Sequence, residues 1–526
     1  MARRGHWPDR RFTGLPLVIL YIPRLSHSML PPHDINDPPQ PGRKFLRMHS
    51  SHDNSEVETR KPLFLDAFQW CLVGVLVTTS AAAASVPAVA TTLAGARYIF
   101  ALGLAYFAWQ SVAHLKKLPI RLDIGFLSWL QICCLVAFTS AIFAWSPTSS
   151  LIYAAAMTLL GIFVSGLMWR RWADGVNFDD AAVLSGTMGA IFTIGIIADL
   201  VGFSFTRTSG DLTSAQALAL SEQANRFRGI FNNPNQASIV AAVAAPLSVA
   251  AWLGKRGMAH LAWAMAALVT IGLSGSRTAL IAVAITGLLL GLRGMGRATQ
   301  EKTFGGMLVA SVIAILAAFT IGANIFRQGL ARLTRGDGGS LLNGREDIWR
   351  EALTLWGDEK AFGYGVGSTG ALPPAMNSQG VIDTSIGSVH NSYIQWLLET
   401  GFVGLIPMAA LVIALIFDIL RQPHSLVHLC LQWSVAAGLL VQLTESSIFG
   451  IGSPYAWIFW FAASAMTALR IRSRHHAVET DKQPRLRGPH GARTGAPSRL
   501  PSPGVVTSGP SAAQPYMRST PPTGDA

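Results

Sequence analysis

Residues 411–420 read Leu-Val-Ile-Ala-Leu-Ile-Phe-Asp-Ile-Leu, and residues 281–292 read Ile-Ala-Val-Ala-Ile-Thr-Gly-Leu-Leu-Leu-Gly-Leu. Neither run alternates apolar and polar residues, as the strands of a transmembrane barrel do. A helix needs about 20 mainly apolar residues to cross a hydrocarbon core of about 30 Å, and several segments of the chain approach that length. Because a helix satisfies its own backbone hydrogen bonds in lipid, the sequence predicts an all-α, polytopic membrane protein.

The composition of the whole chain supports this class. Half of the 526 residues are hydrophobic and only 13% are charged, with a mean hydropathy of +0.38. The formal net charge of +13 lies largely in the two tails and in short connections, so it indicates membrane topology and argues against a nucleic-acid partner. The four cysteines lie inside apolar segments with no spacing typical of zinc or of a disulfide framework, so we expect neither; they are Cys71, Cys133, Cys134 and Cys430.

About twelve apolar segments predict about twelve transmembrane helices. They cover residues 64–84, 94–113, 124–146, 151–169, 181–203, 236–253, 258–274, 277–292, 304–323, 394–420, 427–449 and 455–470. Lys and Arg gather in alternate connections, which the positive-inside rule assigns to the cytoplasm. An even number of spans then leaves both termini in the cytoplasm.

The domain organisation follows from these spans. We expect a disordered cytoplasmic segment at 1–62, a transmembrane domain at 63–470, and a disordered cytoplasmic tail at 471–526 that is rich in Pro, Gly, Ser, Thr and Arg. Two outer loops are longer than the rest, at 204–235 and, between helices 9 and 10, at 324–393. Both carry arginines on the face that usually avoids them, which favours an anionic ligand over indifferent surface charge.

The first candidate motif is Arg228-Gly-Ile-Phe-Asn-Asn-Pro-Asn235, directly before a predicted span. Asn235 is expected to cap that helix, with contact to a ligand as the alternative, and Pro234 is expected to keep the approach to the helix extended. Arg228 is a fixed cation next to a turn and a helix N-terminus, a combination suited to phosphate.

The second candidate is Arg277, at the head of a span after the connection Ser274-Gly-Ser. An arginine in this position can simply reach toward lipid headgroups. However, the connection belongs to the predicted outer face, and Gly275 allows the backbone to approach an anion closely. We therefore favour a functional role for Arg277.

The third candidate is the long loop at 324–393. Arg345 follows Gly344 and opens a predicted amphipathic helix, whose apolar positions are Ile348, Trp349, Ala352, Leu353 and Leu355. The run Gly363-Tyr-Gly-Val-Gly367 matches neither of the glycine patterns that bind nucleotides, so tight turns are the expected role of its glycines.

His390 and Asn391 stand at the start of the tenth span. A single histidine is usually structural, but an imidazole can accept and release a proton near neutral pH. Asn391 is a candidate for positioning a sugar, whereas packing at the helix end is the expected role of Tyr393. Glu399 and Glu445 lie near the outer ends of spans, and each is expected to pair with an arginine.

Taken together, these motifs resemble the superfamily of O-antigen ligases and O-antigen polymerases, which are glycosyltransferases of the bacterial inner membrane. The resemblance covers roughly residues 225 to 405. Ala361 departs from it, because a proline is expected ahead of the glycine turn. The motifs that carry the resemblance are Arg228 to Asn235, Leu273-Ser-Gly-Ser-Arg277, Gly344-Arg-Glu-Asp-Ile-Trp349 with Gly363 to Gly367, and His390-Asn-Ser-Tyr with Glu399-Thr-Gly401.

The resemblance implies a multi-pass protein of the bacterial inner membrane that acts on a glycan carried by undecaprenyl diphosphate, in the periplasm. Arg277 and Arg345 would clamp the diphosphate with help from Arg228, and His390 would orient or deprotonate the acceptor hydroxyl. Asn391 and Asn235 would be further substrate contacts. No metal ion or other cofactor would be required, because arginine can stabilise the leaving charge.

Several alternatives stay open at this point. The acceptor could be the lipid A core, which makes the protein an O-antigen ligase and is our first choice. It could instead be a second lipid-linked unit, which makes an O-antigen or exopolysaccharide polymerase, or a hydroxyl of a protein. A transporter could use the same arginines to move an anionic glycolipid without chemistry, although the predicted spans carry few charges at their centres.

Overall fold

The computed structural model describes residues 61–80, 87–113, 125–174, 178–201, 227–231, 233–255, 257–295, 345–369, 388–421 and 425–482. These residues form helices, turns and irregular connections, with no strand among them, which confirms the all-α class. The predicted span at 304–323, residues 1–60 and the tail beyond 482 lie outside the described residues.

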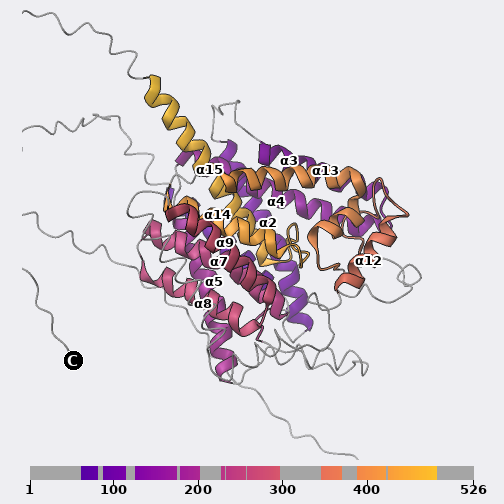
Figure 1. Cartoon of the computed structure of the whole chain (residues 1–526), viewed down its shortest axis with the longest axis horizontal. Coiled ribbons are helices and arrows are strands. Elements are labelled where there is room, and N and C mark those ends of the chain that lie inside the picture. The colour runs from indigo at the N-terminus through magenta and orange to yellow at the C-terminus, as the bar shows by residue number, and fades with distance from the viewer. Residues whose placement is uncertain are drawn as a thin grey trace, which may run out of the picture. The chain divides into compact units, whose positions relative to one another are not determined.

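Twelve helices occur in the described ranges (Figure 1). Eleven of them coincide with predicted spans, and α12 is the predicted amphipathic helix of the long loop. The helices are α1 (Lys61–Ser80), α2 (Pro87–Ala113), α3 (Gly125–Ile142), α4 (Pro147–Asp174), α5 (Phe178–Leu200), α7 (Pro234–Lys255), α8 (Met258–Ser274), α9 (Arg277–Met295), α12 (Arg345–Trp356), α13 (Ser392–Leu420), α14 (Leu426–Val441) and α15 (Pro454–Lys482).

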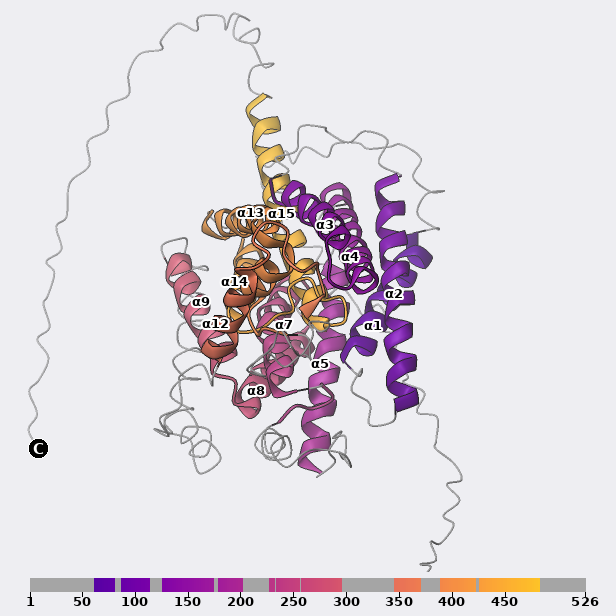
Figure 2. The ribbon, with the colours of Figure 1, turned by 90° about the vertical axis from the view of Figure 1, so that its right-hand side faces the viewer.

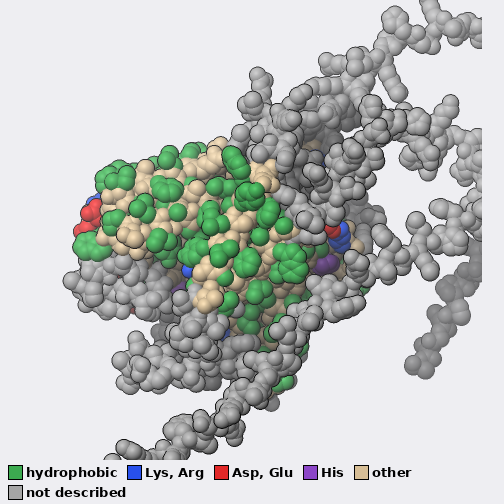
Figure 3. All heavy atoms as spheres, turned by 180° about the vertical axis from the view of Figure 1, so that it is seen from behind, with side chains coloured by type: hydrophobic (Ala, Val, Ile, Leu, Met, Phe, Trp, Pro, Cys, Tyr) green, Lys and Arg blue, Asp and Glu red, His purple; other side chains and the backbone are tan. Residues whose placement is uncertain are grey.

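Five of these helices are long and apolar enough to cross a membrane, namely α3, α4, α5, α7 and α13. Shorter apolar helices lie at Ala67–Ser80, Met258–Ser274 and Leu426–Val441. The chain is thus a multi-pass membrane protein, and the total of twelve spans stays a prediction. Figure 3 shows one face of the molecule, which is broadly apolar and has charged side chains only near its edges.

The centre of the helical domain is formed by α7 and α15. Almost every side chain from Tyr455 to Met466 of α15 is fully buried, and most of α7 is buried as well. A helix that is apolar all round belongs in such a central position. Helices far apart in the sequence meet around this centre. For example, α3 lies beside α13 (Figures 1 and 2).

Short connections fix the directions of the C-terminal helices. Because α7, α8 and α9 follow one another through connections of a few residues, α7 and α9 run in the same direction. The end of α9 lies beside the end of α13, where Arg293 Nη1 donates to the Ile419 carbonyl at 2.9 Å. Since α14 starts there, α14 runs antiparallel to α9. The N-termini of α7 and α9 therefore lie at the end of the bundle where α14 finishes, here called the site end.

Two predicted helix ends differ from the observed ones. The span predicted at 427–449 ends at Val441, and residues 442–453 form turns instead. The cause is local, because this stretch contains several polar residues followed by Gly450 and Gly452, which favour turns over helix. The last span, predicted at 455–470, continues as helix to Lys482. The first difference matters most, since the turn at 442–453 contributes to the site.

Candidate functional site

His390 sits on a strained backbone at the site end. Its φ is +54°, and among the described residues it is the non-glycine residue with positive φ. Such a conformation costs of order 1–3 kcal/mol and tends to occur at functional positions. Neighbouring groups hold it in place. The Trp349 indole donates to the Val389 carbonyl at 3.1 Å, and the His390 N–H donates to Ser388 Oγ at 3.1 Å.

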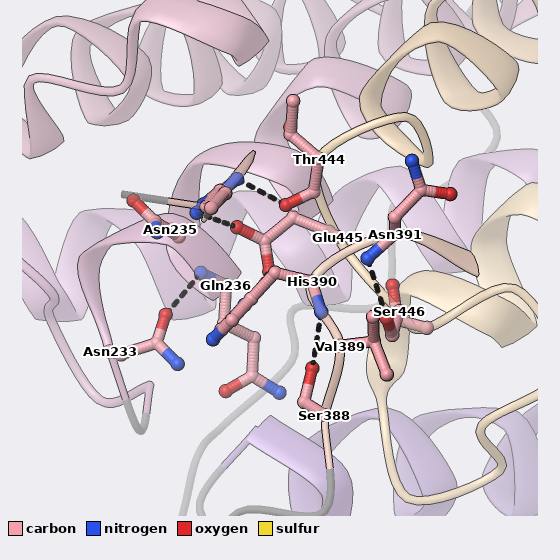
Figure 4. Close-up of polar contacts among 12 residues, drawn as sticks. Asn233, Asn235, Gln236, Ser388, Val389, His390, Asn391, Thr444, Glu445 and Ser446 are labelled. Atoms are coloured by element: carbon pink, nitrogen blue, oxygen red, sulfur yellow. Dashed lines mark hydrogen bonds and ion pairs between the residues drawn. The ribbon is translucent and has the colours of Figure 1, made fainter. Parts of the chain in front are cut away.

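Glu445 lies next to His390 (Figure 4), and its carboxylate contacts both His390 and Arg345. Its Oε2 is 3.6 Å from His390 Nδ1, and its Oε1 accepts a hydrogen bond of 2.9 Å from Arg345 Nη2. The three side chains are largely shielded, with exposures of 23% for His390, 15% for Arg345 and 12% for Glu445. One carboxylate therefore links two of the three residues that were predicted to be catalytic.

Arg345 is the first residue of α12, as predicted. Besides Glu445, its guanidinium donates to the Thr444 carbonyl, so the turn at 442–453 anchors it. The prediction that Glu445 pairs with an arginine is confirmed. The apolar face predicted for α12 is also used, because Ala352 and Leu355 are buried against the start of α13.

Asn391 caps α13. Its Oδ1 accepts the N–H groups of Tyr393 at 3.0 Å and Ile394 at 3.1 Å, and its Nδ2 donates to the Leu443 carbonyl at 2.9 Å. The Asn391 N–H also donates to Ser446 Oγ at 2.9 Å. The amide of Asn391 is thus engaged in fixing the backbone beside His390. Its predicted contact with a sugar is untested.

The expected role of Tyr393 in packing agrees with its surroundings. The Tyr393 hydroxyl donates to the Leu439 carbonyl of α14 at 3.0 Å. Ser392, next to it, donates through its N–H to the carbonyls of Gln442 and Glu445 at 3.0 Å each. These bonds tie the start of α13 to the turn that holds Glu445.

The N-terminus of α7 is capped by Asn233, whose Oδ1 accepts the Gln236 N–H at 2.7 Å. The prediction that Asn235 caps this helix is wrong. Pro234 is the first residue of α7, a position that suits proline because the N–H it lacks has no partner within the helix there. In Figure 4, Asn235 and Gln236 lie on the side of the site that faces His390 and Glu445, where ligand contact by Asn235 stays a prediction.

Arg228 lies in the turn before α7. Its carbonyl accepts the Phe231 N–H at 3.1 Å, while its half-buried guanidinium has no hydrogen bond or ion pair with any residue in the described ranges. Burial lowers the pKa of Arg228 from its ordinary value, although a guanidinium keeps its charge at neutral pH. Glycine is required at the next position, because Gly229 has a φ of +56° and its Cα packs against Gly195.

Arg277 is the first residue of α9, after a connection of two residues, where a short connection was predicted. Gly275 has a φ of +64° and ends α8, and Ser276 Oγ faces the Ala279 N–H at 3.5 Å. The Arg277 side chain is half-buried and makes no hydrogen bond or ion pair with another described residue. The charge of Arg277 is therefore not neutralised within the described part of the chain.

The position of Arg277 along the bundle follows from one hydrogen bond. Trp433 Nε1 donates to the Val283 carbonyl at 3.1 Å, which aligns α14 with α9. Arg277 precedes Val283 by roughly 9 Å along α9, and Val441 follows Trp433 by roughly 12 Å along α14. Because the helices are antiparallel, Arg277 lies at the same end as the turn that carries Glu445.

The glycine run at 363–367 forms tight turns, as predicted, with positive φ at Gly363, Gly365 and Gly367. It also completes a break in α13. The backbone of Gly401 leaves the helical region, with φ +61° and ψ −161°. The carbonyls freed at residues 398 and 399 accept the N–H groups of residues 364 and 365, and the N–H groups of residues 402 and 403 donate to the carbonyls of residues 360 and 361.

Glu399 is buried at this break. Its Oε1 accepts Thr369 Oγ1 at 2.6 Å and Gln395 Nε2 at 3.1 Å, and the N–H groups of Gly367 and Thr369 also bond to the carboxylate. The prediction that Glu399 pairs with an arginine is wrong for the described part of the chain. The glycine turns satisfy the carboxylate instead, because they bring backbone donors to it.

The described residues contain no group of three or more His, Cys, Asp or Glu side chains arranged to hold a metal ion. Among the described residues, Arg228, Arg277 and Arg345 contribute positive charge at the site end. Sequence reasoning identified all three, together with His390, but it did not anticipate that Glu445 would bridge His390 and Arg345. The feature of the sequence that could have indicated this contact is the cluster of polar residues directly before Gly450.

Comparison with known proteins adds one match. A family described as O-antigen ligase matches residues 260–409, a segment that includes Arg277, Arg345 and His390. A comparison with curated proteins gave no match. The predicted resemblance is confirmed over the matched segment.

Proposed function

Since residues 260–409 match a family described as O-antigen ligase, we propose that the protein transfers a glycan from undecaprenyl diphosphate to an acceptor hydroxyl at the periplasmic face of the bacterial inner membrane. The acceptor is the lipid A core, which makes the reaction an O-antigen ligation. The family match supports an enzyme for glycan transfer or polymerisation, and the finer assignment is ours.

The arginines at the site end support binding of the diphosphate. Arg277 and Arg228 have no partner among the described residues, so their charges are available to a ligand. A partly shielded guanidinium binds phosphate oxygens strongly, through two parallel hydrogen bonds. In the transition state, the same groups stabilise the negative charge that develops on the leaving diphosphate, so the mechanism requires no metal ion.

Arg345 contributes differently, because Glu445 already binds it. Arrival of the diphosphate brings a second anion to Arg345, and the guanidinium then divides its donors between the phosphate and the carboxylate. Glu445 keeps the arginine in a fixed orientation in the meantime. A preorganised cation of this kind stabilises the transition state without reorganisation.

His390 is the proposed base. Its Nδ1 faces Glu445, which leaves Nε2 for the acceptor hydroxyl. The acceptor oxygen forms a bond to the anomeric carbon, the bond from that carbon to the diphosphate oxygen breaks, and undecaprenyl diphosphate leaves with the bonding electrons. The hydroxyl proton passes to Nε2, and Glu445 stabilises the imidazolium that results. Direct displacement inverts the configuration at the anomeric carbon.

The observation that carries the proposal is the shared carboxylate of Glu445, within 3.6 Å of His390 and 2.9 Å of Arg345. A transporter that binds an anionic glycolipid needs the arginine but has no use for a histidine oriented as a base. The link between a proton acceptor and a phosphate-binding cation is what a transfer reaction requires.

The glycan profile of a deletion strain tests this function. The strain would be complemented with wild type, Arg277→Ala or His390→Ala, and lipid-A-linked, polymeric and diphosphate-linked glycans would be resolved. We expect both variants to accumulate intact polymer on undecaprenyl diphosphate and to lose it from lipid A. Accumulation of single repeat units would instead identify a polymerase, and a normal profile with His390→Ala would favour the transporter.

A further inference from the structure

Arg97 is a cation within the apolar helix α2, outside the site described above. Its Nη2 donates to the Tyr98 hydroxyl at 3.2 Å, and its guanidinium carbon lies 4.9 Å from the centre of the Tyr98 ring. The Nε atom is buried without a hydrogen-bond partner, and no carboxylate of the described residues forms an ion pair with Arg97. A charged group in an apolar helix is costly to keep, so its persistence here points to a ligand.

Two further elements approach Arg97. The turn after α14 comes so close that a Cβ at Gly452 would lie 2.8 Å from Arg97 Nη1. Tyr153 of α4 lies close enough to Arg97 and Tyr98 for an electrostatic interaction with both. The Tyr153 ring packs against Gly367 and is 52% exposed, so it presents an aromatic surface next to the cation.

Two buried hydroxyls without partners lie in the same region. Ser150 precedes Tyr153 by three residues and so shares its face of α4, and Ser368 follows Gly367. Both side chains are fully buried, and neither Oγ has a hydrogen-bond partner among the described residues. Because neither side chain has any exposed surface, a ligand that arrives from outside contacts Arg97 and Tyr153 and not these hydroxyls.

The glycine run connects this region with the proposed catalytic residues. Gly367 contacts Tyr153 and also binds the carboxylate of Glu399, at the break in α13. From there the first part of α13, residues 392–400, leads back to His390 over about 13 Å. The Tyr153 side of the region is thus connected to His390 through the glycine run and the first part of α13.

We propose that Arg97, Tyr98 and Tyr153 form a second anion-binding site, which takes a phosphate or carboxylate group on the saccharide of the glycolipid acceptor. This proposal rests on the proposed glycan transfer and specifies how the acceptor is held. The guanidinium binds the anion, the tyrosines contact the sugar ring, and the site positions the acceptor hydroxyl at His390.

Binding to purified full-length protein in neutral-lipid nanodiscs tests the proposal without any turnover. The probe is lipid A with its phosphorylated core oligosaccharide, compared with the same probe after dephosphorylation. We expect Arg97→Gln to weaken binding of the phosphorylated probe about tenfold or more and to leave the dephosphorylated probe unchanged. Tyr153→Ala truncates a half-exposed side chain of the site, so the variant should fold and should weaken binding of both probes severalfold.

Control variants separate this site from others. Arg350→Gln removes an exposed arginine and should bind like wild type, and Arg277→Gln should retain binding of this probe while losing donor binding. Equal binding by wild type and both site variants would overturn the proposal. Full competition by phosphatidylglycerol vesicles would also overturn it, because Arg97 would then hold an ordinary lipid headgroup. If the wild-type protein transfers no glycan, the proposed function is wrong. The binding experiment still shows whether Arg97 belongs to a second anion-binding site, because it requires no turnover.

Discussion

His390 Nδ1 lies 3.6 Å from Glu445 Oε2, across the contact between the start of α13 and the turn after α14. The same carboxylate binds Arg345, so movement of the turn would affect both residues together. The backbone of His390 itself is strained, with a φ of +54°. The orientation of the histidine is thus set by tertiary contacts, and this arrangement leads to specific predictions.

Replacing His390 should strongly slow transfer while leaving donor binding in place. We expect His390→Gln to lower kcat by about 10²- to 10⁴-fold, the usual contribution of a general base, with little change in the KM for the lipid-linked donor. Steady-state kinetics with purified protein would measure both. His260→Gln is a matched control, because His260 contacts Ser185 on α5, far from the site end. Equal activity of the two variants would refute the role of His390.

Glu445→Gln should lower kcat by roughly tenfold or more, because a neutral amide does not stabilise the imidazolium that forms on His390. The KM for the donor should fall, since the carboxylate no longer competes with the diphosphate for Arg345. The two parameters can be obtained from one series of donor concentrations. A rise in the donor KM with an unchanged kcat would mean that Glu445 serves only to hold Arg345.

Arg277 and Arg293 occupy opposite ends of α9 and offer a matched pair. Arg277→Gln should reduce transfer strongly and change the free energy of unfolding by no more than about 0.5 kcal/mol, because the side chain has no partner in the described ranges. Arg293→Gln should have little effect on transfer. It should lower the free energy of unfolding by about 1–3 kcal/mol, since Arg293 donates to three carbonyls at the end of α13. Thermal unfolding in detergent would measure the stability of each variant, and transfer assays would measure its activity. Similar results for the two variants would contradict the prediction.

Gly401→Ala should destabilise the protein by about 2 kcal/mol or more and reduce activity. A Cβ at Gly401 would overlap the Ala361 carbonyl, and φ is positive there, so the break in α13 could not form. Gly186→Ala in α5 is the control, because a Cβ there meets nothing within 4 Å. That variant should be neutral or slightly more stable. Comparable unfolding midpoints for the two variants would show that the break tolerates a side chain.

Transfer should persist after removal of divalent cations, since arginines supply the positive charge in the proposed mechanism. Purified protein assayed with excess EDTA should retain its full rate, and added Mg²⁺ should not increase it. Activity that falls in EDTA and returns with Mg²⁺ or Mn²⁺ would require a metal ion in the mechanism. The assay should use lipid free of bound cations so that the result is unambiguous.

The sequence alone was enough to identify the class of protein and most of the candidate residues. Apolar run length predicts membrane helices because bilayer thickness and backbone hydrogen bonding leave few alternatives. Local chemistry likewise predicted the start of α12 at Arg345 and a short connection before Arg277, as the structure has them. Capping was less predictable, because Asn233 and Asn235 both suit a cap and only the course of the chain selects Asn233.

Only the tertiary structure brought distant residues into contact. Glu445 follows His390 by 55 positions and Arg345 by 100, and no local pattern indicates that one carboxylate reaches both. The partners of Glu399 were also decided in three dimensions, where the glycine turns supplied backbone donors in place of an arginine. Periodicity and propensity act over a few neighbouring residues, whereas such contacts depend on how whole helices pack. The sequence by itself thus determined a helical membrane protein with its arginines and histidine, and helix packing decided which carboxylate joins them.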